Sequence, residues 1–133
     1  MNDDIDRASE PPERLRVLVI DDEPLIGRAV KRTLADHDVV YEERSDRAIA
    51  RLRAGEPFDV VLCDLRMPGS DGLAVLATIA TLAPQLARRS VLMTGGASEE
   101  ALTTIAARGV RMLEKPFEPE ALHRALREAA RCT

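Results

Sequence analysis

The stretch that decides the fold is Leu15-Arg16-Val17-Leu18-Val19-Ile20, an apolar run of strand length that stops at Asp21-Asp22-Glu23. Later runs of the same kind also stop at a polar side chain: residues 59–63 at Asp64, residues 90–93 at Thr94 and residues 110–114 at Lys115. Short apolar strands that alternate with helical patterns predict βαβ units and a parallel sheet. Because parallel strands end at the same edge of a sheet, we expect these polar groups to gather in one crevice.

The alternation predicts five strands and five helices, which is an α/β fold with a doubly wound, five-stranded parallel sheet. The second strand is expected at residues 39–43 and, because its end is polar, at an edge of the sheet. The flavodoxin-like order 2-1-3-4-5 places strands one and three side by side, so that Asp22 faces Asp64. Strands four and five then add Thr94 and Lys115 on the other flank of Asp64.

Local signals set the expected ends of several helices. The first helix is expected to begin at Pro24, where a missing N–H costs nothing. Ser45 or Asp46 is expected to cap the second helix, and Ser98 a later one. A helix that follows a Pro- and Gly-containing turn is expected to end at Pro84.

Length and composition exclude several classes of protein. The chain has 133 residues, the size of one ordinary domain, with 45% apolar and 32% charged residues. Residues 1–13 are predicted to be a flexible acidic tail, and residues 14–133 the folded domain. The net charge of −4 and the absence of Trp argue against a nucleic acid as partner. No run approaches the about 20 apolar residues of a membrane span, and the acidic start is not a signal peptide.

The two cysteines do not have the spacing of metal ligands. Cys63 falls within a predicted strand and is expected to be a buried free thiol, whereas Cys132 is expected to be exposed. Together they indicate a reducing compartment, and we expect a cytoplasmic protein.

The strand-end residues have the chemistry of a divalent metal site. Adjacent carboxylates repel each other unless a cation is present, and hard oxygen ligands select Mg²⁺ or Mn²⁺. Each residue also has a plainer interpretation: Asp22 or Glu23 could cap a helix, and Asp64 could belong to a turn. Thr94 could simply end its strand, and Lys115 could lie on the surface. It is the joint pattern that favours a site.

On these motifs the chain resembles the receiver domain of two-component response regulators. The matching parts are the acidic pair Asp21-Asp22, the segment from Asp64 to Gly72, Thr94, and Lys115-Pro116-Phe117. The intervals from Asp22 to Asp64, from Asp64 to Thr94 and from Thr94 to Lys115 are 42, 30 and 21 residues, as in that family. The resemblance covers about residues 14–131 and implies a cis peptide bond between Lys115 and Pro116.

The resemblance implies that Asp64 accepts a phosphoryl group from the phosphohistidine of a sensor histidine kinase or a histidine phosphotransfer protein. It implies a Mg²⁺ ion held by Asp22, Asp64 and the backbone carbonyl of Arg66, with Asp21 acting through water. Lys115 would pair with a phosphoryl oxygen and Thr94 would donate to another. The phosphorylation state would control protein–protein interaction, and the chain would not be an enzyme beyond the chemistry of its own aspartate.

Certain positions depart from the family pattern. Met112, three residues before Lys115, stands where many receivers have an aromatic ring that swings inward, which puts that coupling in doubt. Arg66 and Gly96 follow Asp64 and Thr94 by two residues, at positions that influence the lifetime of the phosphate in this family.

The output face is expected on the helix from Ser98, the fifth strand and the last helix, and it is also the face of an expected homodimer.

Two alternatives remain open at this point. The chain could be a stand-alone receiver, or the receiver of a hybrid histidine kinase, which residues 93–117 resemble somewhat more closely than DNA-binding regulators. It could also be a Mg-dependent phosphohydrolase that works through an aspartyl phosphate. One feature argues against a phosphohydrolase. Such enzymes usually have an acid–base aspartate two residues after the nucleophile, where this chain has Arg66.

Overall fold

The computed structural model describes residues 14–132. The predicted tail, residues 1–13, lies outside the described residues, as does Thr133. The boundary between tail and domain therefore stays a prediction.

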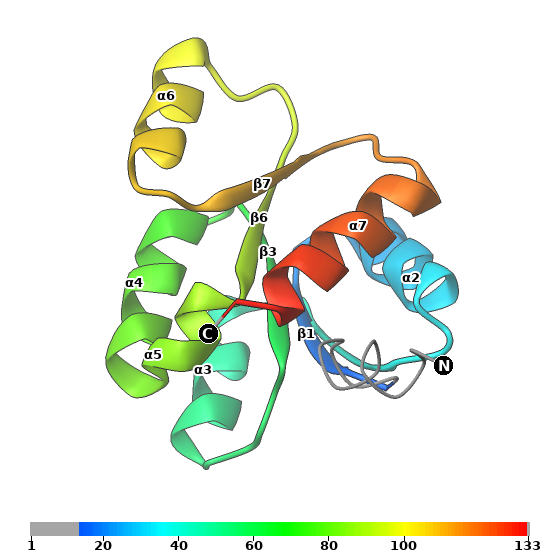
Figure 1. The fold of residues 1–133 in the computed structure, drawn as a ribbon. Helices are drawn as coiled ribbons and strands as arrows, with labels where there is room; N and C mark the ends of the chain where they lie inside the picture. The colour runs from blue at the N-terminus through cyan, green and yellow to red at the C-terminus, as the bar shows by residue number, and fades with distance from the viewer. Residues whose placement is uncertain (1–13, 133) are drawn as a thin grey trace, which may run out of the picture.

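A parallel sheet forms the centre of the molecule (Figure 1). Its order is β2-β1-β3-β6-β7, which is the predicted order 2-1-3-4-5 with β6 and β7 as the fourth and fifth strands. All of the neighbouring pairs in this sheet are parallel, and β2 lies at an edge as predicted. The strands are β1 (Arg16–Ile20), β2 (Asp38–Glu42), β3 (Val60–Asp64), β6 (Ser90–Thr94) and β7 (Arg111–Glu114).

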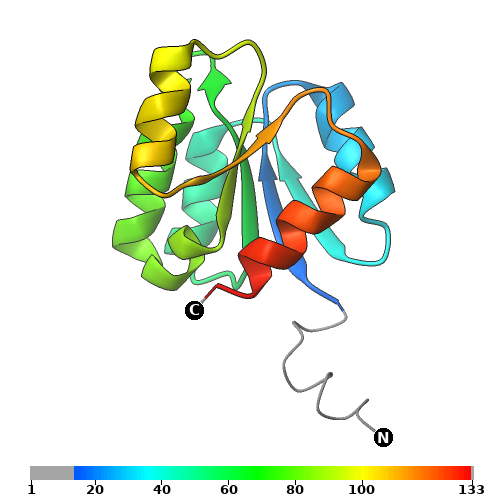
Figure 2. The ribbon, with the colours of Figure 1, turned by 45° about the horizontal axis from the view of Figure 1, so that its top comes forward.

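Helices cover both faces of the sheet (Figure 2), which is why the strands are apolar on both sides. On one face α2 and α7 pack against alternate strand residues such as Val17 and Val19. On the other face α3, α4, α5 and α6 pack against the intervening ones, such as Leu18 and Ile20. The helices are α2 (Pro24–Thr33), α3 (Ser45–Arg53), α4 (Gly72–Leu82), α5 (Pro84–Arg88), α6 (Glu99–Ala107) and α7 (Pro119–Ala130).

The described residues thus contain six helices rather than the five predicted. Pro84 does not only follow a helix; it also begins the short helix α5, because a proline at the first helical position loses no hydrogen bond. Ala83, at φ −149°, separates α4 from α5. None of the helices in the described part of the chain is long and apolar enough to span a membrane.

Two of the predicted helix starts are confirmed and one is wrong. Pro24 begins α2, and the Ser98 hydroxyl accepts a hydrogen bond from the Ala101 N–H at 3.1 Å. Neither Ser45 nor Asp46 caps α3, because the helix already begins at Ser45 and both lie in its first turn. Asp46 instead pairs with the Arg44 guanidinium, 2.6 Å away.

The segment after β3 forms a small hairpin where the sequence predicted only a turn. It consists of β4 (Arg66–Met67) and β5 (Ser70–Asp71), which pair antiparallel. Asp71 then caps α4 by accepting a hydrogen bond from the Leu73 N–H at 2.8 Å. Gly72 lies against the end of β3: a Cβ there would be 2.5 Å from the Asp64 carbonyl oxygen, so this close approach requires glycine.

The cysteine predictions are confirmed in one case and wrong in the other. Cys63 is fully buried in β3, and burial is the main cause that raises the pKa of its thiol above the ordinary range. Cys132 is half-buried rather than exposed. The Arg89 guanidinium donates to its backbone carbonyl at 2.8 Å and ties this end of the chain to the residue before β6.

Candidate functional site

The carboxyl-terminal edge of the sheet gathers the strand-end residues, as predicted. Asp21 follows β1, Asp64 ends β3, Thr94 ends β6 and Lys115 follows β7. Asp21 is fully buried, and Asp64 and Thr94 are 5% and 3% exposed. Four polar residues from distant parts of the sequence therefore lie at one edge of the sheet, and the Lys115 side chain is only 12% exposed, which contradicts its interpretation as a surface residue.

Lys115 is the centre of this arrangement. Its Nζ lies 2.8 Å from an oxygen of Asp21 and 3.3 Å from an oxygen of Asp64. It also lies 3.4 Å from Glu23, a carboxylate of the acidic turn that was predicted only as a possible helix cap. One ammonium thus bridges the ends of β1 and β3. The only signal for Glu23 in the sequence is its position directly after Asp21-Asp22.

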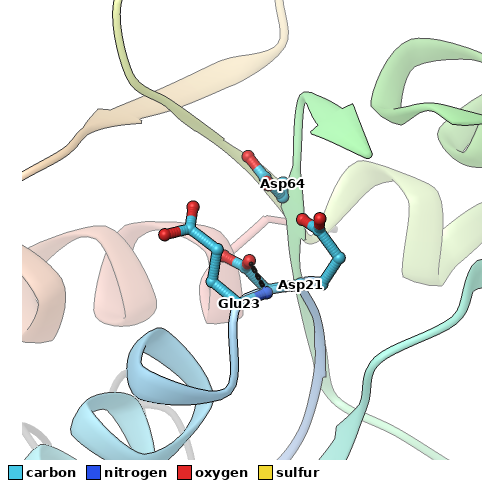
Figure 3. A group of neighbouring side chains, drawn as sticks. Asp21, Glu23 and Asp64 are labelled. Carbon is cyan, nitrogen blue, oxygen red and sulfur yellow. Dashed lines mark hydrogen bonds between the residues drawn. The ribbon is translucent and has the colours of Figure 1, made fainter. Parts of the chain in front are cut away.

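An acidic cluster surrounds the ammonium. Asp21, Asp22, Glu23 and Asp64 each offer one carboxylate oxygen, and these oxygens lie within 4.8 Å of one another. Figure 3 shows Asp21 and Glu23 at the end of β1 beside Asp64 at the end of β3. The dashed line there marks the Glu23 N–H, which donates to Asp21 at 2.9 Å and closes the turn.

The electrostatics of the cluster leave negative charge to be neutralised. Burial, and next the negative charge of Asp21, raises the pKa of Asp64 to about 6, although Lys115 acts in the opposite direction. For Lys115, burial lowers the pKa, but the hydrogen bond from its ammonium to Asp21 and the nearby carboxylates outweigh burial and raise it. A single ammonium thus faces several hard oxygen donors, a set that suits a divalent cation such as Mg²⁺ or Mn²⁺.

A small pocket of about 100 Å³ opens onto Asp64. Arg66 and Lys115 stand at this pocket, and the Arg66 side chain is exposed. The residues that line the pocket are Glu23, Asp64, Leu65, Arg66, Gly95, Ala97 and Lys115. The pocket is large enough for a phosphoryl group.

The backbone ties Thr94 to Lys115. The Lys115 N–H donates to the Thr94 carbonyl at 2.6 Å, and this hydrogen bond links the ends of β6 and β7. The Lys115–Pro116 peptide bond is cis, as the resemblance implied. Met112, in β7, is 37% exposed.

Tyr41 was missed as a residue of the site, because the sequence gives no sign that its ring reaches from the edge strand β2 to the acidic turn. Its hydroxyl donates to the backbone carbonyl of Asp21 at 2.6 Å. Only the three-dimensional pairing of β1 with β2 brings the two together.

The chain matches proteins of known type over most of its length. The family model described as "Response regulator receiver domain" matches residues 17–127. Over 122 residues the chain is 34% identical to the positive alginate biosynthesis regulatory protein of Pseudomonas aeruginosa, covering 88% of this chain and 48% of that protein. It is also 34% identical over 122 residues to the nitrate/nitrite response regulator protein NarL of Escherichia coli, covering 89% of this chain and 56% of that protein. The chain thus spans about half the length of these two relatives.

Solved structures share the fold. The receiver domain of NtrX from Brucella abortus superposes with a TM-score of 0.77 at 30% identity, covering 88% of this chain and 99% of that one. The chemotaxis protein CheY4 of Vibrio cholerae gives a TM-score of 0.75 at 28% identity, covering 87% and 98%. With the matched residues extending from β1 into α7, and so across the whole sheet, the chain belongs to the family of response regulator receiver domains.

Proposed function

We propose that this receiver domain takes a phosphoryl group onto Asp64 from a phosphohistidine, and that the phosphorylated and free forms differ in the proteins that they bind. The donor would be a sensor histidine kinase or a histidine phosphotransfer protein. The observation that carries the proposal is the Lys115 ammonium, which bridges Asp21 and Asp64 beside a pocket of about 100 Å³.

Asp64 is the proposed nucleophile. With a pKa of about 6 its carboxylate is ionised at neutral pH, so an oxygen lone pair is available for attack on phosphorus. The new O–P bond forms as the P–N bond of the phosphohistidine breaks. The histidine nitrogen keeps the electron pair of the broken P–N bond. The ring exchanges protons with solvent, so that a neutral imidazole is left. The product is an aspartyl phosphate.

The acidic cluster is the proposed metal site. Asp22, Asp64 and the Arg66 backbone carbonyl would hold Mg²⁺ directly, with Asp21 acting through water; Mn²⁺ has the same preference for oxygen ligands. When bound, the ion neutralises charge on the transferring phosphoryl group. Asp21 would keep its place with or without the metal ion, because both of its carboxylate oxygens accept a hydrogen bond, one from the Glu23 N–H and one from Lys115.

Lys115 and Thr94 are the proposed groups that receive the phosphoryl oxygens. Lys115 is 3.3 Å from Asp64, so its ammonium can pair with a phosphoryl oxygen while it keeps its 2.8 Å contact with Asp21. The Thr94 hydroxyl would donate to a second oxygen. Because the Lys115 N–H is bonded to the Thr94 carbonyl, movement of either residue displaces the ends of both β6 and β7. This is phosphoryl transfer by positioning and charge compensation.

The output would be read on α6 and β7, which follow Thr94 in the chain, and on α7, which follows Lys115. This face is also where we propose that a homodimer forms. Met112, exposed on β7, provides no aromatic ring that could move inward, so the signal would depend on the backbone of β6 and β7. Attachment to a hybrid histidine kinase remains a prediction.

Phosphorylation with acetyl phosphate and Mg²⁺, followed by intact-mass measurement, tests the proposal. We expect one phosphate on the wild type and none on Asp64→Asn. Asp71→Asn is the matched control: Asp71 is an exposed aspartate after the same strand, and Asn serves equally well as a helix cap, so this variant should be phosphorylated normally. Phosphate on Asp64→Asn, or none on the wild type, would refute the assignment.

The same samples separate the receiver from a phosphohydrolase. A receiver takes up one phosphate per molecule, and its aspartyl phosphate is then slowly hydrolysed. A phosphohydrolase instead turns over many molecules of a phosphate ester. Sustained release of p-nitrophenol from p-nitrophenyl phosphate in the presence of Mg²⁺ would favour the enzyme. We expect no such turnover, because Arg66 stands where these enzymes usually have an acid–base aspartate.

A further inference from the structure

Tyr41 connects the edge of the sheet to the acidic turn. It lies in β2, opposite Val19 of β1 in the strand register. Its hydroxyl donates to the Asp21 carbonyl at 2.6 Å, a short bond for two uncharged groups. A side chain from the edge strand therefore reaches past the end of β1 and contacts the first residue of the turn that holds the acidic cluster.

The ring of Tyr41 also fills a place made for it. It packs on the face of the sheet that α2 and α7 cover, against the buried Gly27 of α2. A Cβ on Gly27 would lie 2.6 Å from carbon atoms of the ring, closer than atoms can approach, so the contact exists only because residue 27 is glycine. The hydroxyl is thus aimed by a ring that has little freedom to move.

The other atoms of Asp21 are tied as well. Its N–H donates to the Glu42 carbonyl at 3.2 Å, so β2 holds the Asp21 residue through both its N–H and its carbonyl. Its carboxylate accepts from the Glu23 N–H at 2.9 Å and from Lys115 at 2.8 Å. Of these hydrogen bonds, the one from the Tyr41 hydroxyl can be removed by deleting a single oxygen atom, with no change to any charged side chain.

We propose that Tyr41 is a positioning residue for the metal site: its hydroxyl fixes the peptide of Asp21 and so holds Asp21 and Asp22 in the arrangement that binds Mg²⁺. This inference rests on the proposed function and adds a residue to it. Residues that orient the ligands of a metal are commonly worth about 10- to 100-fold in its affinity. Because Tyr41 acts through the backbone, we expect the low end, about tenfold.

Tyr41→Phe is the test, because it removes only the hydroxyl and leaves the ring against Gly27. His37→Phe is its matched control. The His37 ring accepts a hydrogen bond from the Leu15 N–H at 3.0 Å, and so it also joins the segments of β1 and β2, but at the opposite end of the strands. Each variant loses one bond between a ring and the backbone, and only one of the two bonds is at the acidic turn.

The measurement is urea unfolding, followed by far-UV circular dichroism, with EDTA and over a series of Mg²⁺ concentrations. The gain in stability with Mg²⁺ gives the dissociation constant of the folded protein independently of its stability without metal. Both variants are expected to unfold at lower urea in EDTA. Tyr41→Phe alone is expected to bind Mg²⁺ about tenfold more weakly, which lowers the gain at saturating Mg²⁺ by about 1.4 kcal/mol.

If Tyr41→Phe binds Mg²⁺ with the same dissociation constant as the wild type, the inference is overturned and the proposed function is left intact. Equal weakening in His37→Phe would overturn it too, since the effect would then come from general destabilisation. If the wild type itself gains no stability from Mg²⁺, the proposed metal site fails and the role of Tyr41 fails with it.

Tyr41 provides a second, independent measurement. It is the only tyrosine in a chain without tryptophan, so the tyrosine emission of the protein comes from this one ring. If its hydroxyl is coupled to the acidic turn, Mg²⁺ should change the emission of the wild type and of His37→Phe, but not that of Asp64→Asn. Unchanged emission in a protein that the unfolding series shows to be metal-bound would contradict the coupling.

Discussion

Replacing Asp64 with Asn is expected to stabilise the metal-free protein at neutral pH, although it removes the residue on which the proposed function depends. The Asp64 side chain is 7% exposed and lies in a cluster with Asp21, with which it shares one ammonium. An ionised Asp64 is therefore held in a buried place beside another negative charge. Asparagine removes the charge at nearly constant shape, and Lys115 keeps its shorter contact with Asp21.

The size of the effect follows from the pKa of Asp64. Burial, and then the charge of Asp21, raises it from 3.8 to about 6. One unit corresponds to about 1.4 kcal/mol, so ionisation of Asp64 costs the folded state up to about 3 kcal/mol relative to the unfolded chain. The asparagine amide must still be desolvated on folding, which offsets part of the gain. We expect Asp64→Asn to be more stable by about 1–2 kcal/mol at neutral pH.

The pH dependence has a definite sign. Between the unfolded pKa of 3.8 and the folded pKa of about 6, the folded protein binds more protons at Asp64 than the unfolded chain does. The stability that the folded protein gains by protonation of Asp64 is therefore complete below about pH 4 and is lost as the pH rises to about 6. The difference between Asp64→Asn and the wild type should follow the opposite course, small near pH 4 and full above pH 6.

Urea unfolding in EDTA, followed by far-UV circular dichroism at several pH values, measures this difference. Adding Mg²⁺ should then stabilise the wild type and leave Asp64→Asn nearly unchanged, so that the order of stability narrows or reverses. The reasoning fails if Asp64→Asn is as stable as the wild type, or less stable, at neutral pH without metal. It also fails if the difference does not shrink at low pH.

The remaining predictions concern neighbouring positions. Lys115→Met leaves Asp21 and Asp64 without their shared cation, and the protein in EDTA at neutral pH should lose about 2 kcal/mol or more of unfolding free energy. Gly72→Ala forces a Cβ to within 2.5 Å of the Asp64 carbonyl oxygen and should cost about 1–3 kcal/mol in urea unfolding, whereas Gly95→Ala, with its nearest contact at 3.5 Å, should cost less. Arg66→Ala should change the lifetime of the phosphate, timed by intact mass after acetyl phosphate is removed; an unchanged lifetime would show that the exposed arginine does not reach the phosphoryl group.

Most of the fold could be predicted from the sequence because its signals are local. Apolar runs of strand length, each ending at a polar residue, predict the parallel strands and the edge at which Asp64 and Lys115 meet. Pro24 and Ser98 mark helix starts through their own backbone preferences. These are properties of a few consecutive residues, so periodicity and turn chemistry are enough to find them.

What the sequence did not predict depends on contacts in three dimensions. The hairpin of β4 and β5 and the extra helix at Pro84 need tertiary packing to choose among several turns that the sequence allows. Ser45 has the chemistry of a cap, yet α3 begins one residue too early for it to act as one. The contacts of Glu23 with Lys115, and of Tyr41 with Asp21, join residues separated by 92 and 20 positions, and no local pattern marks them.

Gly72 ties the start of α4 to the end of β3. The Gly72 N–H donates to the Leu65 carbonyl at 2.8 Å, and its missing Cβ lets α4 rest directly on the peptide of Asp64. If Asp64 is phosphorylated as proposed, we expect α4, which is held this closely, to stay in place and α6 to be displaced. Distance probes follow directly: a spin label on α4 serves as the stationary reference, and its partner on α6 reports the change of state.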